Sequence, residues 1–184
     1  DIDKTNTIYF LIDESHSLGV LGKNGNGVLA SLAFKSNIEK ILVSSLGKAF
    51  GVNGGIIAGS QRFINSIKEI PLFIGSAGMS PAFLDAFVKG TIIYNHQLEK
   101  LKGNCQYIYD RLHHLEMIKI SENYPVFFVN DDQIAAYLKE KNILITSFYY
   151  PATTQKINRI VLNANHSKEQ LNVLIENLLS FGEN

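Results

Sequence analysis

An amine and a carboxylate follow two separate apolar segments of the sequence, in places where side chains can carry out chemistry. Lys48 lies on a glycine-flanked turn just after the apolar segment 41–45, and Asp13 directly follows the apolar segment 8–12. If the two segments are parallel strands, both side chains emerge at the carboxyl edge of the sheet, where open α/β folds bind their ligands. The spacing therefore predicts a ligand site, although a surface lysine and a turn-capping aspartate share the same local pattern.

Two further polar residues accompany this pair. Ser45 precedes Lys48 by three residues and can direct its hydroxyl at an anion that the lysine also approaches. His16 follows Asp13 by three residues and can reach the same pocket, or it can satisfy a backbone carbonyl. Burial would raise the pKa of the Asp13 carboxyl, and a cationic partner would offset that change and keep the group ionised.

Nucleotide binding is a different interpretation of the same segments. An apolar strand followed by Asp13 and Glu14 resembles the magnesium-binding strand of an ATPase, which requires a phosphate loop ending in Gly-Lys-Ser or Gly-Lys-Thr. Both Gly-Lys pairs fail this test, because Lys23 is followed by Asn and Lys48 by Ala. The segment 25–30 has dinucleotide-loop spacing, but it does not directly follow an expected strand. We therefore disfavour a nucleotide site.

The composition is that of a globular domain. The 184 residues include 17 Lys and Arg against 17 Asp and Glu, and 46% are hydrophobic. A net charge of zero argues against a nucleic-acid or anionic-membrane surface built on bulk charge. No apolar run approaches the roughly 18 to 20 residues that cross a bilayer. The single cysteine, Cys105, cannot form an intramolecular disulfide, and we expect a cytoplasmic protein.

The pattern of the first half predicts alternating strands and helices. Its apolar runs are rich in residues that favour β-strands, as in strands that are covered on both faces. We expect strands at 8–12, 41–45 and 54–59, the first two parallel and the third turning back on the second. Further expected elements are a helix over 61–69 ended by Pro71, an extended segment over 72–76, and a long helical run over 82–115 that Gly90 and Gly103 can interrupt.

The second half alternates in the same way. Its expected elements are an extended segment at 126–129, a helix over 133–141, strands over 143–148 and 159–163, and a final helix. Ser167 and Gln170 form a capping-box pattern at the start of that helix. We predict an α/β fold over residues 1–104, ending in a long bridging helix, and a small α+β lobe over residues 105–184.

Two separated motifs together resemble the α-oxoamine synthases. They are Asp13-Glu14-Ser15-His16-Ser17-Leu18-Gly19 and Ser45-Leu46-Gly47-Lys48-Ala49-Phe50-Gly51. That family consists of pyridoxal-phosphate enzymes with the aspartate-aminotransferase-like fold, known as fold type I. The resemblance runs along the whole chain but covers only the C-terminal half of such an enzyme, so we expect this chain to be part of a longer polypeptide whose remaining half completes the active site.

The resemblance implies a role for each of these residues. Lys48 would form the imine with the cofactor aldehyde and later act as the general base. Asp13 would bind the protonated pyridine nitrogen, His16 would hydrogen-bond the phenolic oxygen, and Ser45 would contact the phosphate. A cofactor that stores a carbanion needs a protonated ring nitrogen, and a carboxylate next to that nitrogen supports this state.

Two later segments also resemble the family. Arg159 corresponds to an arginine that grips the substrate carboxylate, a task that suits its two parallel N–H donors. Ser76 belongs to a segment that reaches the cofactor phosphate of the neighbouring subunit. The sequence departs from the family there, with Ala77 in place of a threonine and Ser80 in place of a proline.

The activity implied by the resemblance is a decarboxylating condensation of an amino acid with an acyl-CoA thioester, catalysed by a homodimer with pyridoxal phosphate and no metal. An aminotransferase that uses the same cofactor is the nearest alternative. A catalytically incomplete scaffold with a role in dimerisation is the non-enzymatic one. No nucleic-acid partner and no membrane span are expected.

Overall fold

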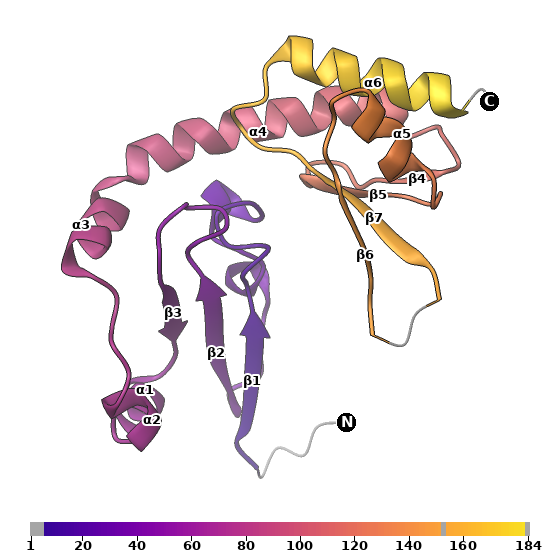
Figure 1. Cartoon of the computed structure of the whole chain (residues 1–184). Helices are drawn as coiled ribbons and strands as arrows, with labels where there is room; N and C mark the ends of the chain where they lie inside the picture. The colour runs from indigo at the N-terminus through magenta and orange to yellow at the C-terminus, as the bar shows by residue number, and fades with distance from the viewer. Residues whose placement is uncertain (1–5, 152–153, 183–184) are drawn as a thin grey trace. The chain divides into compact units, whose positions relative to one another are not determined.

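The chain forms two compact units, residues 1–96 and 97–184. The computed structural model describes residues 6–151 and 154–182. We call the two parts unit 1 and unit 2 and describe each by itself (Figure 1).

Unit 1 is built on a three-stranded sheet with the order β1-β2-β3. Its strands are β1 (Ile8–Asp13), β2 (Ile38–Ser45) and β3 (Gly55–Ala58). The first two are parallel, and β3 returns antiparallel to β2. The three expected strands and their directions are thus confirmed. Two single-turn 3-10 helices, Lys23–Gly25 and Leu29–Ser31, lie in the connection between β1 and β2.

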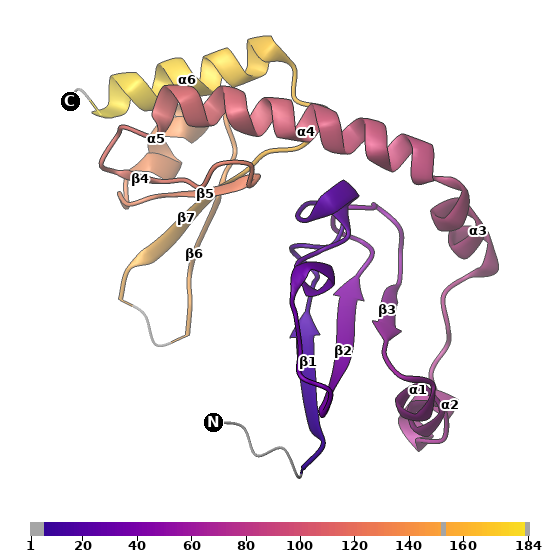
Figure 2. The ribbon, with the colours of Figure 1, turned by 180° about the vertical axis from the view of Figure 1, so that it is seen from behind.

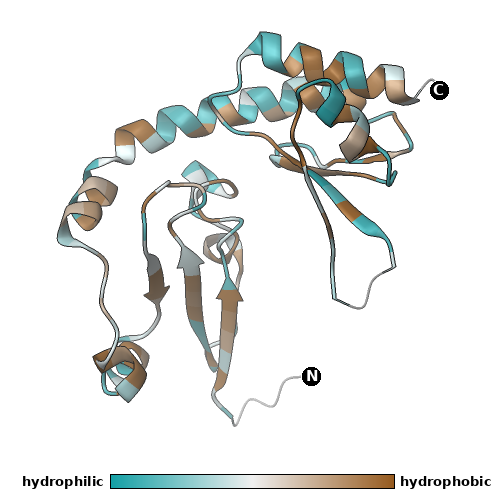
Figure 3. Cartoon of the chain, viewed as in Figure 1, coloured by the Kyte–Doolittle hydropathy of each residue, from teal (hydrophilic) through white to brown (hydrophobic). Residues whose placement is uncertain are grey.

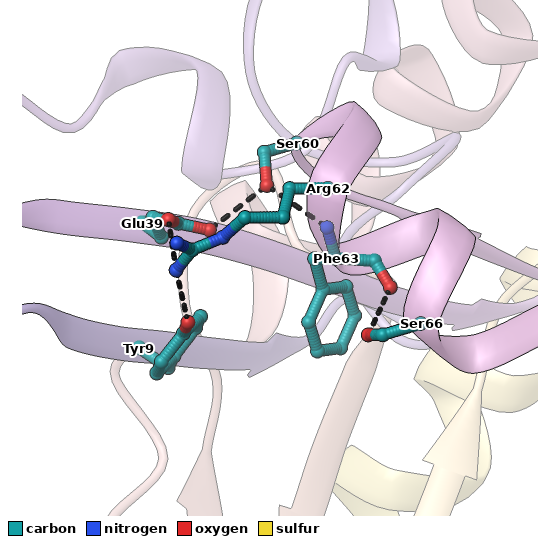
Figure 4. A network of polar contacts seen from close by, with 6 residues as sticks. All are labelled: Tyr9, Glu39, Ser60, Arg62, Phe63 and Ser66. Carbon is teal, nitrogen blue, oxygen red and sulfur yellow. Dashed lines mark hydrogen bonds and ion pairs between the residues drawn. The ribbon is translucent and has the colours of Figure 1, made fainter. Parts of the chain in front are cut away.

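Helix α1 (Gln61–Lys68) follows β3 and is tied to the sheet by polar contacts (Figure 4). Ser60 caps the helix by accepting a hydrogen bond from the Phe63 amide at 3.3 Å. Its hydroxyl also donates to Glu39 of β2 at 2.8 Å. Arg62 donates to the Tyr9 hydroxyl of β1 at 2.8 Å and forms an ion pair with Glu39 at 3.4 Å. The expected helix is confirmed.

One expectation for the next segment is wrong. The extended segment expected over 72–76 is helical at its start, as α2 (Pro71–Ile74), because proline suits the first turn of a helix as well as its end. The long helical run is present and is interrupted at one of the two expected glycines, so that it forms α3 (Pro81–Lys89) and α4 (Thr91–Leu112), with Gly103 inside α4. The division falls at Gly90, where an added Cβ would lie 2.8 Å from the Tyr94 ring.

Unit 2 has a four-stranded antiparallel sheet with the order β4-β5-β7-β6. Its strands are β4 (Ile118–Lys119), β5 (Val126–Val129), β6 (Thr146–Tyr149) and β7 (Lys156–Val161), and its helices are α5 (Ile134–Glu140) and α6 (Lys168–Gly182) together with most of α4. Every expected element is present, with shifted ends, and the two-residue β4 is additional. Ser167 and Gln170 form the expected capping box at α6.

One continuous core holds unit 2 together. Its fourteen buried members are Cys105, Ile108, Leu112, Ile118, Phe127, Val129, Ile134, Leu138, Ile160, Leu162, Leu171, Leu174, Ile175 and Leu178. Helix α6 lies beside the later part of α4 in both views (Figures 1 and 2), and the Tyr107 hydroxyl donates to Asn172 between them at 2.6 Å. No described helix in either unit has the length and apolar character needed to cross a membrane.

Unit 1 buries much less apolar surface. Its buried hydrophobic side chains are Ile41, Leu46 and Val52. Strand β1 is strongly hydrophobic (Figure 3), yet Tyr9 and Leu11 are 49% and 62% exposed. The expectation that β1 is covered on both faces is therefore not met within the described part of this chain.

Candidate active site

Asp13 ends β1 and carries its carboxylate at the carboxyl edge of the sheet, in register with Val43 of β2. The side chain is exposed. Its Oδ1 atom accepts a hydrogen bond from the Ser15 amide at 2.8 Å. Hydrogen bonding from Ser15 is the largest cause that lowers the pKa of Asp13, and the charges of Lys48 and His16 lower it further. Asp13 is therefore an ionised acceptor at neutral pH.

Lys48 lies on the closed turn that joins β2 to β3. The Leu46 amide donates to the Gly54 carbonyl at 3.0 Å, and the Val52 amide donates back to the Leu46 carbonyl at 3.1 Å. These two bonds fix the base of the turn and leave the Lys48 side chain exposed at its tip. The amine and the Asp13 carboxylate thus come from the ends of neighbouring parallel strands, as the sequence predicts.

A direct hydrogen bond joins the two loops at this edge. The Ser45 amide, at the end of β2, donates to the Ser15 hydroxyl at 2.9 Å. The Ser45 hydroxyl accepts a bond from the Gly47 amide at 3.3 Å, so its own proton is available to an anionic ligand. His16, which follows Ser15, is exposed, and its charge acts on Asp13. The four residues Asp13, His16, Ser45 and Lys48 therefore share one edge of unit 1.

An aromatic cluster anchors the far side of the lysine turn. Phe50 packs edge-on against Phe87 of α3 and Tyr94 of α4, with ring centroids 5.1 and 5.0 Å apart. Gly19, in the loop after β1, has a φ of 83°, and an added Cβ there would lie 2.7 Å from Ala49 and 2.9 Å from Phe50. The two loops are therefore in close contact, and residue 19 must be glycine.

From the sequence, Glu14 is only a candidate metal ligand, but in the structure its carboxylate has a different role. Its carboxylate is fully buried and accepts hydrogen bonds from Ser17, Val28 and Leu29. Among the residues that the structure describes, no group of three His, Cys, Asp or Glu side chains is arranged to hold a metal ion. The sequence could have indicated only one of these three contacts, the one between Glu14 and Ser17, which lie three residues apart. The Val28 and Leu29 amides are fourteen and fifteen residues away, so no local pattern links them to Glu14.

Ser76 is already engaged in a local contact. Its hydroxyl donates to the Leu72 carbonyl at 2.5 Å, at the end of α2. A phosphate accepts hydrogen bonds, so the Ser76 hydroxyl would have to release this bond to contact one. The phosphate contact suggested for Ser76 remains a prediction.

Arg159 belongs to unit 2 and lies on β7, between Thr146 of β6 and Phe128 of β5. Its guanidinium lies 5.8 Å from the Phe148 ring centroid. The Nε atom is buried and has no hydrogen-bond partner among the described residues. Unsatisfied buried donors are rare, so this N–H is a candidate for binding an anion.

A cavity of about 790 Å³ in unit 2 includes Arg159 in its wall. Its other charged or titratable lining residues are Lys141, His166 and Glu169, and apolar side chains such as Leu144 and Val173 complete it. The cavity can therefore accommodate a ligand with an acidic group and an apolar part.

A family model described as "Aminotransferase class I and II" matches residues 1–178. The chain is 29% identical over 185 residues to 8-amino-7-oxononanoate synthase of Petrotoga mobilis, covering 94% of this chain and 47% of that protein. It is 26% identical over 201 residues to serine palmitoyltransferase 2 of Dictyostelium discoideum, covering 99% of this chain and 41% of that protein. The chain thus spans about half the length of the curated relatives it matches.

Solved structures give the same picture of the fold. An 8-amino-7-oxononanoate synthase of Francisella tularensis superimposes with a TM-score of 0.74 at 25% identity, covering 95% of this chain and 56% of that one. A serine palmitoyltransferase of Sphingomonas wittichii superimposes with a TM-score of 0.76 at 20% identity, covering 94% of this chain and 47% of that one. The second likeness concerns the fold alone.

Proposed function

Because the chain belongs to the aminotransferase class I and II family, we propose that it forms part of a pyridoxal-phosphate-dependent acyltransferase of the α-oxoamine synthase type. The enzyme would condense an amino acid with an acyl-CoA thioester. The α-carbon loses a proton and gains the acyl group as the thioester C–S bond breaks. Coenzyme A leaves as the thiol, the amino acid carboxylate leaves as carbon dioxide, and a proton returns to the α-carbon.

One observation carries this proposal more than any other. The Asp13 carboxylate and the Lys48 amine stand at the ends of neighbouring parallel strands, and the lysine charge contributes to the lowered pKa of the acid. A carboxylate and an amine that influence each other across an open sheet edge suit a ligand with a cationic ring nitrogen at one end and an aldehyde at the other.

The donors and acceptors of this edge fit pyridoxal phosphate. Asp13 is an ionised acceptor for a ring N–H, the Ser45 hydroxyl can donate to phosphate, and the exposed Lys48 amine can hold the aldehyde through Nζ. When bound, the cofactor supplies an electron sink that accepts the charge left on the α-carbon. His16 would donate to the phenolic oxygen, and Ser76 remains a candidate for a phosphate contact from a neighbouring subunit.

The proton transfers fall to Lys48 and the substrate alignment to Arg159. In its neutral form, Lys48 Nζ would accept the α-proton. The unpartnered Nε of Arg159 and its cavity suit the carboxylate of the amino acid. We further propose a cytoplasmic homodimer with no nucleic-acid partner.

Two alternatives lead to different results. An aminotransferase would release a keto acid from the amino acid and would form no carbon–carbon bond. A scaffold without catalysis would retain the fold and assemble without binding the cofactor. Its support is that this chain spans about half the length of its relatives.

Titration with pyridoxal phosphate tests the proposal in the complete protein that contains this chain. We expect a visible absorption band that Lys48→Ala abolishes and that Lys35→Ala, a change at another exposed lysine, leaves intact. Release of coenzyme A from an acyl-CoA in the presence of an amino acid supports the acyltransferase, and release of a keto acid supports the aminotransferase. A complete protein without the band would contradict the enzyme assignment.

A further inference from the structure

Glu14 is a buried acid that the proposed chemistry does not use. It directly follows Asp13, and its side chain is fully buried. The Val28 amide donates to its Oε2 atom at 3.0 Å, and the Leu29 amide donates to Oε1 at 2.6 Å. The Ser17 hydroxyl also donates to Oε2. Both carboxylate oxygens are therefore occupied by donors of unit 1.

This arrangement favours the ionised form of Glu14. Burial opposes ionisation and is the largest single cause, but the hydrogen bonds from Ser17, Leu29 and Val28 together outweigh it and lower the pKa of Glu14. The Val28 and Leu29 amides can only donate, one to each carboxylate oxygen, so an amide side chain in this place would direct its NH2 group at a backbone N–H.

The loop from residue 14 to residue 29 closes around this carboxylate. The Gly19 amide donates to the Gly25 carbonyl at 2.7 Å, and the Gly27 amide donates to the Leu21 carbonyl at 2.9 Å. Gly27 has a φ of 78°, and an added Cβ would lie 2.5 Å from the Glu14 carboxylate. The backbone at Gly27 therefore packs directly against the Glu14 carboxylate, with no space for a side chain between them.

The backbone that Glu14 fixes carries the residues of the candidate site. Asp13 precedes it, and Ser15 follows it. The Ser15 amide donates to Asp13, and the Ser15 hydroxyl accepts from the Ser45 amide at the end of β2. Any rotation of the backbone at Glu14 would therefore move the Asp13 carboxylate and the start of the Lys48 turn relative to each other.

We infer that Glu14 is a positioning residue whose buried carboxylate sets the placement of Asp13 against the Ser45–Lys48 turn. The inference deepens the proposed function and rests on it where cofactor binding is concerned. It assigns Glu14 no contact with the cofactor or the substrate.

Hydrogen exchange and cofactor titration of Glu14→Gln in the complete protein test this inference. The amide keeps one acceptor oxygen and places its NH2 group against the N–H of either Val28 or Leu29, which can only donate, so the loop should loosen. Without cofactor, we expect exchange of the Leu29 and Ser45 amides to accelerate at least about tenfold. Displacement of Asp13 should weaken its contact with the ring nitrogen and raise the dissociation constant of pyridoxal phosphate at least about tenfold, which corresponds to about 1.4 kcal/mol.

Two further variants keep the test decisive. Ile41→Ala removes a buried side chain of β2, so it lowers the stability of unit 1 without changing the loop; it should accelerate exchange evenly over the strands of unit 1, with no selective effect at Leu29 and Ser45, and leave the dissociation constant unchanged. Ser17→Ala removes a single donor to Glu14, so it serves if Glu14→Gln does not fold, and it should produce the same changes to a smaller degree.

The outcomes separate this inference from the proposed function. Faster exchange at Leu29 with an unchanged Ser45 amide would overturn the inference, since Glu14 would then only stabilise its own loop. Unchanged exchange at both amides would overturn it as well. If the unsubstituted protein binds no pyridoxal phosphate, the proposed function fails, and the Ser45 amide still decides whether Glu14 positions the two loops.

Discussion

The two units of the chain are held together by different means. Unit 2 has a core of fourteen buried residues contributed by α4, α5, α6 and its sheet. Among its described residues, unit 1 buries the three hydrophobic side chains Ile41, Leu46 and Val52, and in its loops it relies on the Glu14 hydrogen bonds and on close contacts at glycines. The proposed cofactor residues all belong to unit 1. The proposed cofactor residues thus lie in the part with the smaller core, whereas Arg159 lies in the part with the larger one.

This difference has a physical consequence for each unit. Burial of apolar surface is the main favourable term in folding, so unit 2 contains most of its own stabilisation. Parallel strands such as β1 are normally covered on both faces, and β1 leaves Tyr9 and Leu11 exposed in unit 1. We therefore expect the stability of unit 2 to change little when residues of unit 1 are replaced. It should fall when residues of the unit 2 core are replaced.

The largest effect should come from Phe127→Ala in unit 2. Phe127 is 0% exposed, whereas its neighbour Phe128 on the same strand is 41% exposed. Removal of a buried phenylalanine costs about 3 to 5 kcal/mol of stability. The free energy of unfolding in urea, monitored by hydrogen exchange of the α6 amides, measures this loss. Phe128→Ala is the matched control and should cost less; an equal loss would contradict the description of the core.

A smaller effect concerns Cys105 and alkaline pH. Burial raises the pKa of this thiol from 9.0 to about 11. The unfolded thiol then ionises before the folded one, so its contribution to stability is present below pH 9 and is lost as the pH rises towards 11. The contribution is at most about 3 kcal/mol, from two pKa units at about 1.4 kcal/mol each.

Comparison with Cys105→Ala isolates this effect, because other groups that titrate at high pH are common to both proteins. The stability difference between the two proteins should narrow from pH 8 to pH 11. Iodoacetamide should leave the folded thiol unmodified at pH 8. Rapid alkylation of the folded protein would show that Cys105 is accessible.

The smallest effect should come from the helix caps, one in each unit. Ser167 caps α6, where it and Gln170 exchange bonds of 3.0 and 3.3 Å, and Ser60 caps α1. Replacement of either serine by alanine should cost about 1 kcal/mol. Hydrogen exchange should locate the loss from Ser167→Ala in unit 2 and that from Ser60→Ala in unit 1. A loss that spreads over both units would contradict their independence.

Much of the fold could be predicted from local sequence. The apolar runs at 8–12 and 41–45 and the capping box at Ser167 each depend on residues close together in the chain. The aminotransferase-like fold is confirmed by the family match and by the likeness to solved structures. The dependence of that family on pyridoxal phosphate follows from the family match. Helix α2 was missed because a proline such as Pro71 is compatible both with the end of one helix and with the first turn of another.

The candidate site was only partly predictable, for a similar reason. Asp13 and Lys48 could be recognised because the first directly follows an apolar segment and the second lies on a glycine-flanked turn three residues past another. Glu14 could not, because its partners Val28 and Leu29 are fourteen and fifteen residues away and contribute backbone amides, which carry no side-chain signature. The catalytic roles of Asp13, His16, Ser45, Lys48, Ser76 and Arg159 remain predictions.

The contact at Gly19 limits how this chain can be redesigned. A side chain at residue 19 would collide with Ala49 and Phe50, next to Lys48. Because the φ of 83° at Gly19 strains any other residue there, smaller side chains at 49 and 50 would not make room for a substitution at this position. Redesign of the loop after β1 must therefore keep this glycine, whatever is changed in the lysine turn.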